Sequence, residues 1–118
     1  MNSTWSITGF AITLLCATSV FAAPSPQSVQ YSLGEELYLN PGRGGCTQCH
    51  GKAGNFPVMP LYPKIGGQSE LYLYNQMIDY REKRRQNGLY VPMEVAMQPF
   101  SDEEIKAMSV YLAQQNAF

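Results

Sequence analysis

The sequence is poor in the residues from which most catalytic and metal sites are built. It has one histidine, His50, and three cysteines in 118 residues, so no active centre that needs a second imidazole can form. Charge is also sparse, with 8 Lys and Arg against 9 Asp and Glu and a formal net charge of −1. There is no basic excess to suggest a nucleic-acid partner, and no apolar run after residue 22 suggests a membrane span.

The histidine and two of the cysteines stand together in the run Cys46-Thr47-Gln48-Cys49-His50. C-x-x-C-H is the attachment pattern of c-type haem. Two thiols at this spacing add to the two vinyl groups of the macrocycle and fix it against one turn of backbone. The imidazole that follows can then take one axial position on the iron. The motif predicts one covalently bound haem c, with Cys46 and Cys49 as its attachment residues and His50 as an iron ligand.

Three other interpretations of the motif are weaker. A structural zinc site needs four nitrogen or sulfur ligands, and only Cys16 remains outside the motif. A thioredoxin-like redox pair belongs to alternating strands and helices, of which the sequence has no pattern. A disulfide between Cys46 and Cys49 gives no reason for His50. Haem attachment is therefore favoured.

The N-terminal residues have the pattern of a leader. Residues 7–21 are uncharged and largely apolar, and Ala22 fits a small-residue cleavage site, so we expect a signal peptide at residues 1–22 and export to the periplasm. No Lys or Arg precedes the run, and an uncleaved anchor is the alternative, although about fifteen residues are few for a bilayer span. We expect a flexible lead-in at residues 23–31 and one small domain at 32–118.

Helical patterns dominate the rest of the chain, and no alternating strand pattern occurs. The first predicted helix begins at Ser32, with Glu35 completing a capping box, and ends at residues 40–42. Residues 51–67 are loop-like in composition. A second helix is predicted from about Ser69 to Arg85, and a third begins at Ser101 with Glu104 in its capping box. These patterns predict an all-α fold.

Several residue groups support a resemblance to a known family, and they lie in the family's order and spacing. They are Gly34 with Tyr38, the haem motif with Gly51, residues 63–68, Tyr72 with Gln76, and Met93 ahead of residues 99–105. On these residues the sequence resembles the small bacterial class I cytochromes c, and especially one lobe of the dihaem periplasmic cytochromes. The resemblance covers most of residues 33–114. Lys83 departs from it, because the family commonly has glycine after the second helix.

The resemblance implies a class I cytochrome c fold, in which three main helices and loops surround one covalent haem. The first and last helices would cross near Gly34 and Tyr111. A proline carbonyl after the motif would orient the axial histidine, and we prefer Pro60 over Pro63 for this role. Tyr62 and Tyr90 are candidates for a hydrogen bond to a haem propionate.

The predicted second axial ligand is Met93. Three of the five methionines after the leader fit packing or loop roles better: Met59, Met77 and Met108. Met93 stands eight residues before the cap at Ser101, as the axial methionine does in the resembling family, and Pro92 favours an extended approach. Met97 is the alternative.

These observations predict an exported electron carrier that passes single electrons between a donor and an acceptor redox protein. A His/Met iron leaves no axial position for a substrate, so we do not expect an enzyme. The alternative is a haem-bearing electron-transfer subunit of a periplasmic dehydrogenase or oxidase complex. The only basic cluster, at residues 81–85, is interpreted as a solvated helix end rather than a docking surface.

Overall fold

The structure is a computed structural model that describes residues 22–116, so the predicted signal peptide lies outside the described residues except for Ala22. Five helices and a short 3₁₀ turn follow one another along this part of the chain: α1 (Pro26–Leu39), α2 (Cys46–His50), the 3₁₀ turn (Lys52–Gly54), α3 (Glu70–Arg81), α4 (Tyr90–Met97) and α5 (Asp102–Ala113). Residues 22–116 contain no strand, and the all-α prediction is confirmed. None of these helices is both long and apolar enough to cross a membrane.

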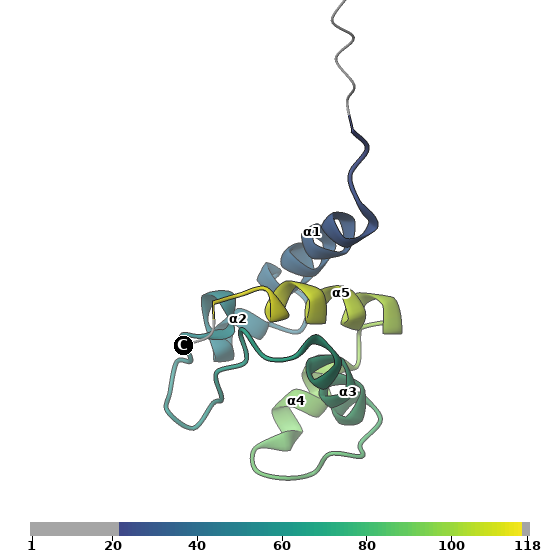
Figure 1. The fold of residues 1–118 in the computed structure, drawn as a ribbon. Helices are drawn as coiled ribbons and strands as arrows, with labels where there is room; N and C mark the ends of the chain where they lie inside the picture. The colour runs from purple at the N-terminus through teal and green to yellow at the C-terminus, as the bar shows by residue number, and fades with distance from the viewer. Residues whose placement is uncertain (1–21, 117–118) are drawn as a thin grey trace, which may run out of the picture.

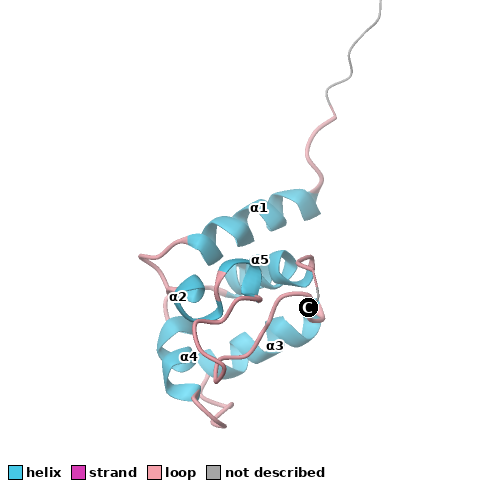
Figure 2. Ribbon diagram, turned by 90° about the vertical axis from the view of Figure 1, so that its left-hand side faces the viewer, coloured by secondary structure: helices cyan, strands magenta, loops and turns pink. Residues whose placement is uncertain are grey.

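Helix α5 lies between α1 and the pair formed by α3 and α4 (Figures 1 and 2). It begins at the predicted capping box, in which the Ser101 hydroxyl accepts from the Glu104 backbone N–H at 3.3 Å and the Glu104 carboxylate accepts from the Ser101 N–H at 2.9 Å. Its inner residues are fully or almost fully buried: Ile105, Ala107, Met108, Val110, Tyr111 and Leu112. Burial of this helix on both sides makes it the centre of the core.

The contact between α1 and α5 depends on Gly34. A Cβ atom at this position would lie 2.0 Å from the carbonyl oxygen of Ala107, so the two helix backbones approach as only glycine allows. Beside this contact the Tyr111 ring packs on Tyr31 and Tyr38. Its centroid lies 5.3 Å from that of the Tyr31 ring and 5.5 Å from that of the Tyr38 ring. The predicted crossing near Gly34 and Tyr111 is confirmed.

Helix α1 begins earlier than predicted. The side chain of Ser25 accepts the Ser28 backbone N–H at 3.2 Å, and Pro26 occupies the first turn. Proline at this position is a helix start, because the N–H that it lacks has no partner within the helix anyway. The predicted start at Ser32 is therefore wrong, and residues 26–31 of the expected lead-in are helical. Ser32 instead donates its hydroxyl to the Ser28 carbonyl.

Helix α3 begins where predicted, with Ser69 as its cap, but it ends at Arg81 and not at Arg85. The chain leaves the helix through Lys83, which has the left-handed φ of 60°. That conformation normally falls to glycine at a helix C-terminus. Lys83 therefore adopts the conformation expected of the glycine that the resembling family commonly has here. Its ammonium group pairs with the Glu94 carboxylate at 3.3 Å.

Helix α4 was not predicted, because its eight residues were interpreted as a connection. Pro92 is the third residue of this helix, where a missing backbone N–H breaks no hydrogen bond within the helix. The extended approach expected at Pro92 is wrong, and Met93 stands on a helix one turn before Met97.

Candidate functional site

One cavity collects the residues that the sequence singled out. Its volume is about 600 Å³, which is within the range of cofactor and small-molecule sites. Cys46, Cys49 and His50 line it together with Met93 and Met97 of α4. Much of the remaining wall is apolar and comes from helices and loops far apart in sequence: Leu61, Ile65, Leu73, Met77, Met108 and Leu112.

The haem motif forms α2, a single helical turn bounded by two glycines with positive φ. Gly45 precedes it with φ 64° and Gly51 follows it with φ 72°. A Cβ on Gly51 would lie 2.0 Å from the carbonyl oxygen of Phe56, so the loop that follows the motif folds back directly on it. This return is fixed by a hydrogen bond from the Phe56 N–H to the His50 carbonyl at 3.2 Å.

No disulfide joins the two motif cysteines, and each is partly buried. Burial, with a smaller effect of neighbouring Cys49, raises the pKa of Cys46 to about 11. A catalytic or redox-active cysteine needs a lowered pKa, since the thiolate is the nucleophile. The environment of Cys46 thus disfavours the thiol-redox interpretation and is compatible with attachment of an apolar ring.

His50 is held in one orientation. Its side chain is buried, with 5% of the residue exposed, and its Nδ1–H donates to the Pro63 carbonyl at 2.9 Å. Burial lowers the pKa of the imidazole, which favours the neutral ring whose free Nε2 lone pair can bind a metal. The preference for Pro60 is wrong and the alternative, Pro63, is the partner. A turn in which the Tyr62 N–H donates to the Met59 carbonyl at 3.1 Å carries the chain past Pro60 before it reaches the ring.

Tyr38 supports the motif from α1, a role that the sequence did not reveal. Its hydroxyl is buried and donates to the Gly51 carbonyl at 2.7 Å. Burial, with a smaller effect of Cys46, raises the pKa of this hydroxyl, so it remains a donor. Tyr38 is one of eight tyrosines, and only its place in the family pattern distinguished it.

Two methionine sulfurs are available to the cavity. Met97 is 2% exposed and belongs to the buried core, whereas Met93 is partly buried and packs against that core. Since the two residues are four apart on α4, both lie on one face of the helix. The structure brings both to the cavity that His50 lines, and the choice of Met93 stays a prediction.

The residues fit a covalently attached macrocycle. The cavity offers an apolar wall, two thiols three residues apart, one oriented imidazole and thioether sulfurs. These are the attachment groups and axial ligands that a c-type haem requires.

The sequence profile described as cytochrome c matches residues 31–116. The chain is 36% identical over 72 residues to cytochrome c4 of Thiocapsa roseopersicina, which covers 61% of this chain and 35% of that protein. It is equally similar over 72 residues to cytochrome c-554(548) of Halomonas halodenitrificans, there covering 86% of the relative. A crystal structure of reduced cytochrome c4 from Pseudomonas stutzeri superposes with a TM-score of 0.66 and 31% identity, over 75% of this chain and 49% of that chain. The chain thus spans half or less of these c4 proteins and most of the c-554(548) protein.

Proposed function

The chain belongs to the cytochrome c family, and we propose that it is an exported monohaem carrier that passes single electrons between two redox proteins. Membership makes it an electron-transfer haem protein and confirms the predicted class I cytochrome c fold. The observation that carries the proposal is the apolar cavity in which the motif cysteines and His50 share walls with two methionines of α4.

In this proposal Cys46 and Cys49 would hold the haem through thioether bonds, and His50, through Nε2, and Met93 would supply the protein ligands of its iron. The haem supplies an iron that alternates between the ferric and ferrous states. The protein keeps the imidazole neutral and oriented through Pro63, and it surrounds the site with apolar side chains that exclude water. With both His50 and Met93 bound to the iron, no coordination site would remain for a substrate, which supports a carrier over an enzyme.

The other parts of the proposal rest on the sequence. A single C-x-x-C-H motif in the chain supports one haem. The apolar run at residues 7–21 supports export, and with it a periplasmic location, where this kind of haem attachment takes place. The donor and the acceptor would be other redox proteins.

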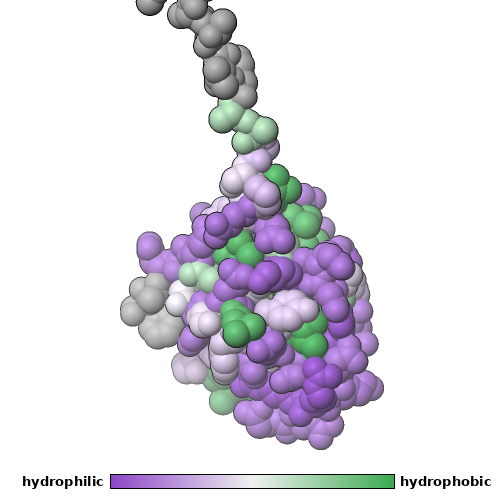
Figure 3. All heavy atoms as spheres, turned by 45° about the vertical axis from the view of Figure 1, so that its right-hand side comes forward, coloured by the Kyte–Doolittle hydropathy of each residue, from purple (hydrophilic) through white to green (hydrophobic). Residues whose placement is uncertain are grey.

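One observation favours a protein partner at the mouth of the cavity. Leu61 and Val95 line the cavity and are yet 69% and 65% exposed, and Leu89 is 48% exposed. This apolar rim would suit either a transient partner or the tight complex of the alternative, in which the protein is the cytochrome subunit of a dehydrogenase or oxidase. By contrast, the face drawn in Figure 3 is largely hydrophilic, with its hydrophobic residues in separate small groups. Size-exclusion chromatography of a native extract distinguishes a free small protein from a subunit of a complex.

The intact mass of the exported protein tests haem attachment. It should equal the mass of the chain from Ala23 plus one haem, and the bare polypeptide mass would refute the proposal.

Methionine substitution tests the iron site. In Met93→Ala we expect the weak near-infrared sulfur-to-iron band of the ferric protein to vanish, the reduction potential to fall and the ferrous iron to bind carbon monoxide. Met97→Ala is the matched control, because it removes the same side chain one turn later. Loss of the band in Met97→Ala alone would assign the ligand to Met97.

A further inference from the structure

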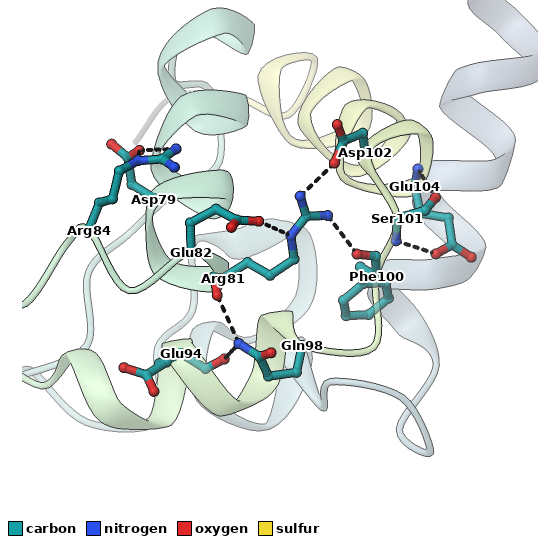
Figure 4. Close-up of polar contacts among 10 residues, drawn as sticks. All are labelled: Asp79, Arg81, Glu82, Arg84, Glu94, Gln98, Phe100, Ser101, Asp102 and Glu104. Atoms are coloured by element: carbon teal, nitrogen blue, oxygen red, sulfur yellow. Dashed lines mark hydrogen bonds and ion pairs between the residues drawn. The ribbon is translucent and has the colours of Figure 1, made fainter.

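The basic cluster at the end of α3 consists of Arg81, Lys83, Arg84 and Arg85. Three of these cations pair with carboxylates: Arg81 with Asp102 at 2.5 Å, Lys83 with Glu94 at 3.3 Å and Arg84 with Asp79 at 2.8 Å. Figure 4 shows the Arg81 and Arg84 pairs, in which the guanidinium groups turn to carboxylates outside the cavity lining. The fourth cation, Arg85, behaves differently.

Arg85 has no carboxylate partner within residues 22–116, and it lines the cavity. Its Nη1 donates to the Gln76 side-chain oxygen at 2.7 Å, and its Nε donates to the Asn87 side-chain oxygen at 3.0 Å. The guanidinium carbon lies 4.8 Å from the centroid of the Tyr80 ring. All three partners also line the cavity. The guanidinium is therefore held in place at the cavity wall, while its Nη2 has no hydrogen-bond partner in the described part of the chain.

The charge of the cavity lining has one sign. Lys64 and Arg85 are its lysine and arginine, and no Asp or Glu of residues 22–116 is among the lining residues. An apolar cavity with cations and no carboxylate complements a ligand that is mainly apolar and carries anionic groups. Haem has this character, because its macrocycle is hydrophobic and carries two propionates.

We propose that Arg85 binds a haem propionate through its Nη atoms and that Gln76 and Tyr80 are its positioning residues. This inference rests on the proposed function, since it requires the haem. A guanidinium already fixed by two hydrogen bonds and a ring loses little side-chain freedom when it binds a carboxylate. The cation favours the ionised propionate, which keeps the pKa of that carboxyl low. A positive charge near the iron also opposes the ferric state and so raises the reduction potential.

The test measures the reduction potential of the haem-loaded protein as a function of pH, from about pH 4 to 9. Wild type is compared with Arg85→Gln, Arg85→Lys and the matched control Arg84→Gln, which removes the same charge from the neighbouring residue. The other ionisable side chains that line the cavity are Tyr38, Tyr62, Tyr72, Tyr80, Cys46, Cys49, His50 and Lys64. All of these groups are present in both Arg85→Gln and Arg84→Gln, so a difference between the two curves does not come from them. Under the proposed function the cysteines and the histidine are bonded to haem, so the propionates dominate the curve.

We expect Arg85→Gln to move the propionate transition upward by about 1–3 pH units and to lower the potential at neutral pH. Arg85→Lys should shift the transition less than Arg85→Gln does, because lysine keeps the charge without the guanidinium fork. Arg84→Gln should leave the curve as in wild type. If Arg85→Gln does not fold, Gln76→Leu replaces it, with a smaller shift in the same direction.

Two results would overturn the assignment in different ways. If the haem is present and the curves of Arg85→Gln and Arg84→Gln coincide, or Gln76→Leu leaves the curve unchanged when it is the variant used, Arg85 does not bind a propionate and the proposed function stands. If the exported wild-type protein carries no haem mass, the proposed function fails and the role of Arg85 fails with it.

Discussion

Replacing Gly34 with alanine tests how closely α1 and α5 must approach. The added Cβ would lie 2.0 Å from the Ala107 carbonyl oxygen and 2.5 Å from its carbonyl carbon. Both atoms belong to the backbone of α5, so neither can rotate away, and the helices must separate. Overpacking of this kind costs up to about 3 kcal/mol. Alanine recovers about 1 kcal/mol through its better helix propensity. We therefore expect a net loss of about 2 kcal/mol in the free energy of unfolding.

For a domain of this size the loss corresponds to a Tm lower by roughly 8–16 °C. Urea unfolding and thermal scans of the haem-loaded protein, followed by circular dichroism, measure both quantities. Gly42→Ala is the control, because a Cβ there would meet only the Asn40 side-chain oxygen at 3.3 Å in an exposed turn. Equal stability of Gly34→Ala and wild type would refute the close backbone contact.

The remaining predictions concern the helix end at Lys83 and the ion pair at Glu104. Lys83→Gly should stabilise the protein by up to about 1 kcal/mol, because glycine takes a left-handed φ without strain. Lys83→Ala loses the same ion pair with Glu94 but keeps a Cβ, so an equal gain in both variants would contradict this reason. The Arg43 guanidinium holds the pKa of the Glu104 carboxyl below its usual value. The ion pair therefore stabilises the fold fully above the pKa of the unfolded state, about 4.3. This stabilisation is lost as the pH falls through the lower pKa of the folded state. In urea titrations the difference between wild type and Glu104→Gln should therefore be constant at neutral pH and shrink in acid, and a difference independent of pH would argue against the ion pair.

The all-α class, the start of α3 and the capping box of α5 could be predicted because they depend on local chemistry. Ser69 and Ser101 accept backbone N–H groups of the helices that follow them, and the Glu104 box forms as its spacing predicts. The haem motif could be identified because its five adjacent residues specify both attachment and ligation. Its two thiols and imidazole do line one cavity.

The predictions that failed concern residues whose structural role is set by the surrounding fold and not by the local sequence. Pro26 falls in the expected flexible lead-in and Pro92 in an expected extended segment, yet each lies in the first turn of a helix, where proline is tolerated. Helix α3 ends four residues before the predicted residue, where Lys83 takes a left-handed conformation. A lysine in this conformation has no sequence signature, so this end could not be predicted. The choice between Pro60 and Pro63 depended on a turn in the loop that composition alone does not specify.

The fold and the site are mechanically connected through α1. Gly34 and Tyr38 are one turn apart and share a face of this helix. At Gly34 the face contacts the α5 backbone, and at Tyr38 it donates the buried hydrogen bond to Gly51, the residue that ends the haem motif. Any change that moves α1 away from α5 must also weaken the hydrogen bond from Tyr38 to Gly51 or displace the end of the haem motif. Gly34→Ala should therefore alter the reduction potential as well as the stability, and an unchanged potential would mean that Tyr38 and the motif move independently of the helix crossing.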